Sequence, residues 1–223
     1  MDKKLAAQAI VKYISGILLM GILIFLPAGT FAFLNGWILM GILFIPMLVA
    51  GLVMVFRNPE LLRKRLSSKE KQKDQQTVVK LSGLMFIAGF ILAGFGYRYG
   101  WYQLPVWVVA VFSVILLLSY AMYMEVMREN AYLSRIVEVQ EGQKVVDTGL
   151  YGIVRHPMYT ATILLFMSMP LVLGSVYSFL VFMVYPIIIA MRIQGEERLL
   201  EKKLEGYAEY KQKVRYRLIP FIW

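Results

Sequence analysis

Cysteine is absent from the sequence, and histidine occurs once, as His156. Without cysteine, the 223-residue chain has no disulfide, no thiolate nucleophile and no sulfur ligand for a metal. With one histidine, a metal site built from several histidines is excluded as well. The glycine-rich fingerprints of dinucleotide-binding domains and P-loops are also missing, so the sequence predicts no soluble nucleotide-binding domain.

Charged residues are missing from several long stretches. Hydrophobic residues make up 59% of the chain, and the mean hydropathy is +0.63. The charge-free runs are about as long as a bilayer core is thick. They predict six candidate spans: Tyr13–Phe33, Trp37–Phe56, Val78–Tyr97, Pro105–Met124, Met158–Ser175 and Tyr177–Met191. The last two runs are short and contain Pro170 and Pro186, so they could instead form a tilted hairpin.

The composition of these runs predicts an all-α polytopic integral membrane protein with about five to six transmembrane helices. No run carries a charge at its centre, which argues against an ion pump or a proton relay. The first run is too long for the apolar core of a signal peptide, so we expect no removable signal peptide.

Positive charges lie almost entirely on one side of this predicted topology. With the N-terminus inside, the inside segments 1–12, 57–80, 125–157 and 192–223 hold 23 of the 24 Lys and Arg residues. The positive-inside rule predicts this asymmetry, so the net charge of +10 requires no nucleic-acid partner. We expect both termini, and any active site, to face the cytoplasm.

Two inside segments differ in kind. Residues 57–77 are very polar and typical of a solvated basic loop, whereas residues 125–157 alternate polar groups with Val, Ile and Tyr. A long irregular segment with apolar content beside a membrane is typical of a functional region. We therefore interpret the chain as one membrane domain, with residues 1–124 as a transmembrane scaffold and residues 125–223 as the catalytic core.

The C-terminal segment has the period of an amphipathic helix. On a continuous helical wheel the apolar face holds Leu200, Leu204, Tyr207, Tyr210 and Val214. Glu196 falls at the centre of this face and Glu197 at its edge. A buried carboxylate needs a partner, and Arg192 lies one turn earlier on the same face.

Arg155, His156 and Pro157 stand directly before the fifth apolar run. Proline favours the first position of a helix, and a helix N-terminus attracts negative charge. The three residues therefore suggest a site for an anion or a carboxylate-bearing ligand. Each feature alone also has a topological explanation, since cations and tyrosines are common at membrane interfaces and acids are common in a first helical turn.

The ordered pattern "GLYGIVRHPMY", a short apolar hairpin, "RIQGEERLLEKKLEGYAEYKQKV" and "IPF" resembles the isoprenylcysteine carboxyl methyltransferases, whose relatives include phospholipid N-methyltransferases. The resemblance covers about residues 125–223. It implies S-adenosylmethionine as cofactor and a lipophilic or prenylated substrate in the bilayer, with no metal and no nucleic acid.

The resemblance also implies roles for individual residues. The implied cofactor contacts are Glu138, Gln143, Lys144, Val145, Val146, Tyr151, His156, Pro157, Met158, Tyr159 and Glu196. Arg155, Arg192 and Glu196 are implied as catalytic, and Arg192 and Glu197 as substrate-binding. Two departures concern Gln143, where family members often have histidine, and the last helix, which is one residue shorter than usual.

The residues leave several functions open. A carboxylate acceptor needs a cation, which Arg155 or Arg192 would provide, and this favours a carboxylate. An amine acceptor needs a base, which Glu196 or Glu197 would have to provide. An NADPH-dependent enzyme similar to sterol reductases and a membrane scaffold without catalytic activity are the two remaining possibilities.

Overall fold

The computed structural model describes residues 3–66, 73–134 and 137–223. Its helices are α1 (Lys3–Ala28), α2 (Leu34–Arg57), α3 (Pro59–Leu66), α4 (Lys73–Arg98), α5 (Val106–Glu129), the 3-10 turn η1 (Gly149–Gly152), α6 (Pro157–Val172), α7 (Val176–Phe182), α8 (Tyr185–Lys203) and α9 (Tyr207–Lys213). None of these residues forms a β-strand. The expected all-α class is confirmed, while the middle of the predicted basic loop, residues 67–72, lies outside the described residues.

Five apolar helical stretches in the described residues are long enough to cross a membrane. They are Lys4–Ala28, Leu34–Arg57, Gln75–Arg98, Val106–Glu129 and Val176–Lys203. The expected fifth run becomes α6, which has 16 residues and falls short of a full span. The expected sixth run extends to Lys203 through α7 and α8, which meet just before Pro186, because proline cannot donate the hydrogen bond that would continue α7.

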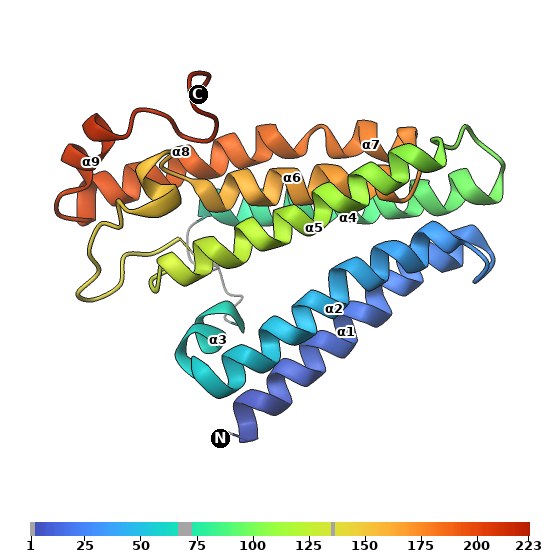
Figure 1. Ribbon diagram of the computed structural model, residues 1–223, viewed down its shortest axis with the longest axis horizontal. Coiled ribbons are helices and arrows are strands. Elements are labelled where there is room, and N and C mark those ends of the chain that lie inside the picture. Colours follow the sequence, from blue (N-terminus) through green and yellow to red (C-terminus); the bar gives the residue numbers. More distant parts are fainter. Residues whose placement is uncertain (1–2, 67–72, 135–136) are drawn as a thin grey trace.

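The helices form two groups in space (Figure 1). Helices α4 to α8 run roughly alongside one another, and the hairpin of α1 and α2 crosses them at an angle. The N-terminus, α3, the segment after α5 and α9 gather at one end of the molecule. At the other end the connections are short, and Leu104 donates a backbone hydrogen bond to Gly174 at 2.9 Å.

A glycine allows a close contact between the two groups. A Cβ atom on Gly94 of α4 would lie 2.6 Å from the carbonyl oxygen of Ile24 in α1. Glycine therefore lets the two backbones approach closely, as is common between membrane helices. The outer faces of α1 and α2 carry exposed apolar side chains such as Leu26 and Phe56, which suits contact with lipid.

The C-terminal segment is not one continuous helix. Helix α8 ends at Lys203, Gly206 adopts a left-handed φ of 80°, and α9 begins at Tyr207. Leu204, Tyr207, Tyr210 and Val214 nevertheless form one buried cluster. The expected apolar face is therefore assembled from two helices, because the turn at Gly206 folds α9 back onto the end of α8.

Candidate active site

A buried ionic cluster lies where α6 begins. The Glu197 side chain accepts hydrogen bonds from Arg155 Nε at 2.8 Å and Arg217 Nε at 3.0 Å, and its Oε1 lies 3.2 Å from His156 Nε2. Glu197 is 3% exposed. Two guanidinium groups and the imidazole offset the cost of burying this carboxylate.

This cluster corrects the helical wheel, which placed Glu196 at the centre of the buried face and Glu197 at its edge. The inward row of α8 contains Ile189, Ile193 and Glu197, each four residues apart and each buried. The orientation of Glu197 is thus set by residues that precede it. The wheel was centred on residues beyond the break at Gly206, where the phase of α8 no longer applies.

Arg155 also ties the C-terminal segment to the start of α6. Its Nη1 donates to the carbonyl oxygens of Val214 at 2.8 Å and Arg215 at 2.7 Å. The backbone N–H groups of Arg155 and His156 donate to the carbonyls of Tyr216 and Arg217, each at 2.9 Å. At this helix start Arg155 thus pairs with the protein's own Glu197 and also lines the pocket described below, and its expected role toward a ligand stays a prediction.

A second polar chain runs beside this cluster. Tyr159 donates its hydroxyl hydrogen to Glu196 Oε2 at 2.5 Å, and Arg192 Nε donates to the Tyr159 oxygen at 2.9 Å. Arg192 Nη1 in turn donates to Gln75 Oε1 at 3.2 Å. Arg192 and Glu196 therefore share a face of α8, as expected, and Tyr159 connects their side chains.

Gln75 also belongs to this series of hydrogen bonds, and the sequence analysis did not predict it. It is 1% exposed, and its amide donates to the carbonyl of Arg192 at 3.3 Å. A Cβ atom on Gly195 would lie 2.3 Å from that amide nitrogen, so the glycine makes room for it. The available signal was position: Gln75 precedes the buried Val78 by three residues and so shares its face of α4.

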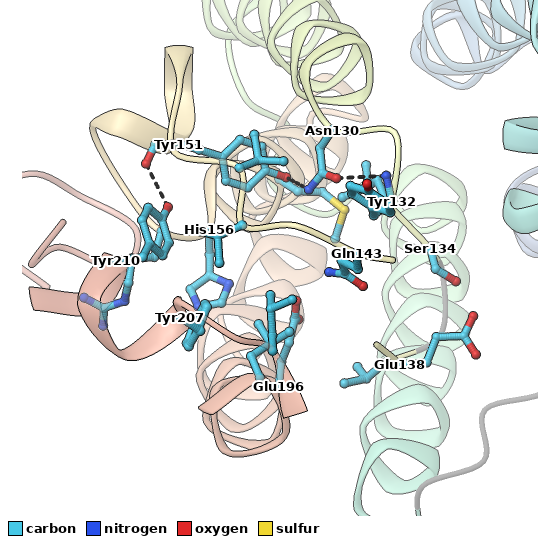
Figure 2. Close-up of a pocket in the computed structure, with 18 of the residues that line it drawn as sticks. Asn130, Tyr132, Ser134, Glu138, Gln143, Tyr151, His156, Glu196, Tyr207 and Tyr210 are labelled. Atoms are coloured by element: carbon cyan, nitrogen blue, oxygen red, sulfur yellow. Dashed lines mark hydrogen bonds between the residues drawn. The ribbon is translucent and has the colours of Figure 1, made fainter. Parts of the chain in front are cut away.

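The pocket beside these chains gathers most of the expected site residues (Figure 2). It has an empty volume of about 840 Å³, including its open mouth. Its lining includes Glu138, Gln143, Lys144, Val145, Val146, Tyr151, Arg155, His156, Met158, Tyr159, Arg192 and Glu196. Two expected residues, Pro157 and Glu197, are not in the lining. Pro157 is the first residue of α6, and Glu197 belongs to the ionic cluster.

Other residues of the pocket were not anticipated as site residues. They are Asn130, Tyr132, Leu133, Ser134, Val137, Leu204, Tyr207 and Tyr210. Asn130 ends α5 and donates to the Tyr151 hydroxyl oxygen at 2.9 Å, and Tyr210 donates to the Tyr151 carbonyl at 2.8 Å (Figure 2). These bonds join the end of α5, η1 and α9 around one space.

Three tyrosines of the pocket are held in the neutral form. Burial raises the pKa of Tyr151, Tyr207 and Tyr210 well above the ordinary value of a phenol. The hydroxyl of Tyr207 is buried and has no hydrogen-bond partner among the described residues. A buried polar atom of this kind normally has a partner, so Tyr207 offers an unused donor to whatever occupies the pocket.

Comparison with known protein families gives a match for part of the chain. A comparison with curated proteins finds no match. The family model described as phospholipid methyltransferase matches residues 105–206. The matched segment contains the expected site residues from Glu138 to Glu197 and leaves α1 to α4 outside. Over residues 105–206 the chain is therefore similar to the phospholipid methyltransferases, a family of membrane methyltransferases that includes enzymes like the isoprenylcysteine carboxyl methyltransferases.

Proposed function

We propose that the protein transfers a methyl group from S-adenosylmethionine to a lipophilic acceptor in the pocket between η1, α6, α8 and α9. One observation supports this proposal. Twelve of the residues to which the resemblance gives a role line the same pocket. We further propose that this pocket and both termini face the cytoplasm, because the positive charges gather at these segments.

The chemistry of the pocket fits this cofactor. Val145, Val146 and Leu200 provide an apolar wall for adenine, and the Tyr207 hydroxyl provides an unused donor. Glu196 is one of two carboxylates in the pocket lining, with Glu138, and it is suited to the cofactor's amino group and to its sulfonium charge. Lys144 is suited to receive the carboxylate end, since the side chains of Arg155 and His156 both face Glu197.

Bound S-adenosylmethionine would supply an electrophilic methyl group: a bond forms from the acceptor to the methyl carbon while the carbon–sulfur bond breaks, and its electron pair stays on sulfur. The protein contributes position and exclusion of water. Tyr159 and Arg192 fix the Glu196 carboxylate, and the phenols of Tyr207 and Tyr210 stay protonated.

We propose a carboxylate as the acceptor, oriented by Arg192. Arg192 lines the pocket, where its side chain donates to Tyr159 and Gln75, and a guanidinium group can hold a carboxylate through two parallel hydrogen bonds. A carboxylate acceptor needs no general base. The second candidate is a lipid amine, which the phospholipid methyltransferase match favours and for which Glu196 would be the base.

Calorimetric titration of the purified protein with S-adenosylmethionine tests the cofactor, and NADPH serves as the comparison ligand. We expect saturable binding of S-adenosylmethionine alone. Labelled methyl transfer is then measured with prenylated cysteine, long-chain acids and long-chain amines. Absence of binding to folded protein would overturn the proposal, and methylation of amines alone would replace the carboxylate with the second candidate.

A further inference from the structure

The chain that follows α9 folds into a closed turn, residues 216–223, which we call the aromatic turn. The backbone N–H groups of residues 217–219 all donate to the carbonyl oxygen of Trp223, at 2.9–3.2 Å. The Arg217 guanidinium lies 5.0 Å from the centre of the Trp223 ring. These contacts hold the aromatic turn together as one unit.

One side of the aromatic turn packs into the core of the membrane domain. Leu218 and Trp223 contact the large buried cluster that also contains Leu165 and Met169 of α6. Thr160, the fourth residue of α6, donates its hydroxyl hydrogen to the Leu218 carbonyl at 2.8 Å. Helix α6 carries no charged residue, and the chain runs from α9 back toward the middle of the bundle (Figure 1). The aromatic turn therefore lies at the depth of an uncharged helix.

The other side of the aromatic turn is apolar and exposed. Phe221 is 87% exposed, Ile222 is 76% exposed and Ile219 is 49% exposed. Phe221 also has a φ of 67°, a left-handed backbone conformation that is uncommon for a bulky residue. Such a conformation persists when surrounding contacts impose it, yet the protein itself buries little of the Phe221 ring. A partner outside the chain explains an exposed apolar surface of this kind.

Positive charge accompanies this exposed surface. Arg215 directly precedes the aromatic turn and is exposed, and no Asp or Glu occurs in residues 210–223. A bilayer interface suits both features, because anionic head groups attract cations while the boundary of the acyl chains accepts apolar and aromatic side chains. A water-soluble partner would not account for the depth of the aromatic turn beside α6.

We propose that the aromatic turn is an interfacial anchor whose partner is the lipid bilayer. Ile219, Phe221 and Ile222 lie among the lipids of the adjacent leaflet, beside the start of α6, while Arg215 contacts anionic head groups. The anchor thus attaches the segment after α9 to the membrane surface, in addition to the attachment that the long apolar helices provide. This inference does not depend on the proposed function.

The anchor is bonded to the ionic cluster through Arg217. Arg217 Nε donates to Glu197 Oε2 at 3.0 Å, and the Arg217 carbonyl accepts a hydrogen bond from the His156 N–H at 2.9 Å. The Arg217 side chain is 28% exposed, so it reaches from the surface to the buried Glu197 carboxylate. Because Arg217 belongs to both structures, the position of the anchor in the leaflet also fixes the depth of the ionic cluster in the membrane.

Site-directed spin labelling tests the anchor, since one introduced cysteine is the only thiol in this chain. A nitroxide is attached to Ile222→Cys and to two references: Ile45→Cys, exposed near the middle of α2, and Glu205→Cys, exposed between α8 and α9. In nanodiscs of phosphatidylcholine and phosphatidylglycerol, electron paramagnetic resonance measures collisions with oxygen, which concentrates in bilayers, and with a nickel chelate, which stays in water. We expect the labels at Ile222 and Ile45 to favour oxygen and the label at Glu205 to favour the chelate.

A second variant tests the apolar contact itself. Phe221→Asp, added to labelled Ile222→Cys, places a carboxylate against the anionic leaflet, and aspartate tolerates a left-handed backbone better than phenylalanine, so the turn keeps its fold. The ratio of oxygen to chelate collisions should fall toward that of the label at Glu205, whereas Ala208→Asp, which adds the same charge to an exposed residue of α9, should cause no shift.

Three results would overturn the proposal. The first is a label at Ile222 that favours the chelate, and the second is an unchanged ratio in Phe221→Asp. The third is a label shielded from both reagents, because another protein surface, such as a second copy of the chain, would then cover the aromatic turn.

Discussion

The N-terminal and C-terminal parts of the chain are both built from apolar helices, yet different contacts hold them in place. Helices α1 and α2 pack through side chains such as Leu39 and through close backbone approaches such as the one at Gly94. The segment from α6 to the C-terminus is joined by hydrogen bonds and ion pairs around Glu197. Apolar packing tolerates exchange of one hydrophobic side chain for another, whereas each member of a buried polar network depends on its partners.

The largest expected effect falls on the C-terminal side of this comparison. Glu197→Ala leaves the Arg155 side chain buried without its counterion, which should reduce the free energy of unfolding by about 3–5 kcal/mol. Leu26→Ala, which changes a lipid-facing side chain that is 72% exposed, is the matched control and should have little effect. Thermal unfolding in detergent measures both variants. Equal unfolding temperatures would contradict a central structural role for the ionic cluster.

The next effect should separate binding from stability. Glu196→Gln removes the pocket carboxylate that accepts the Tyr159 hydrogen bond, and a lost hydrogen bond to a charged group costs about 1.5–3 kcal/mol. We expect the dissociation constant of S-adenosylmethionine to rise by about 10- to 100-fold. Glu205→Gln, which changes an exposed glutamate near the same helix end, serves as the control. Unchanged affinity in Glu196→Gln would mean that the cofactor contacts are misassigned.

The scaffold has its own sensitive point at Gly94. The Cβ of Gly94→Ala would lie 2.6 Å from the Ile24 carbonyl oxygen, a backbone atom that cannot move aside cheaply. Forcing α1 and α4 apart should cost about 1–3 kcal/mol of stability. Gly51→Ala, where nothing lies within 4 Å of the added atom, provides the comparison in α2. Chemical denaturation would show the difference, and equal stability would argue against close packing of α1 on α4.

The smallest effect concerns a single hydroxyl group. Tyr207→Phe removes a group without a partner among the described residues, so stability should be unchanged or slightly higher. Cofactor affinity should fall by about two- to tenfold, the value of one neutral hydrogen bond. Tyr210→Phe should show the reverse pattern, because its hydroxyl bonds to the Tyr151 carbonyl. If Tyr207→Phe also left affinity unchanged, its hydroxyl would have no part in binding.

Local pattern predicted the helices, and the family resemblance implied many of the residues that line the pocket. Of the six predicted runs, five fall on the long apolar stretches and the fifth run falls on the shorter α6. The sequence "RHP" located the start of α6. Pattern could not predict which carboxylate of the Glu196–Glu197 pair is buried. Neighbouring residues on a helix point in directions that differ by 100°. Because the helix breaks at Gly206, the residues after it do not continue the helical wheel of α8.

Contacts between distant segments were beyond the reach of these patterns. Gln75 bonds to Arg192 across 117 positions in the sequence, and the basic surroundings of Gln75 gave the impression of a solvated loop. The hollow between the α1–α3 region and helices α5 and α6 likewise exists only because these helices are placed against one another. Such relations depend on how helices pack, which helical periodicity within each segment does not specify.

The tether between Arg155–His156 and the residues around Val214 has a consequence for ligand exchange. Side-chain and backbone hydrogen bonds fasten the segment after α9 to the start of α6, so we expect the pocket wall at Arg155 and His156 to keep its place while ligands exchange. We then expect a bulky molecule to enter and leave past the other wall of the pocket. There Tyr132–Ser134 and Val137–Val146 contain no helix. We expect rearrangement of this helix-free wall to limit the turnover rate.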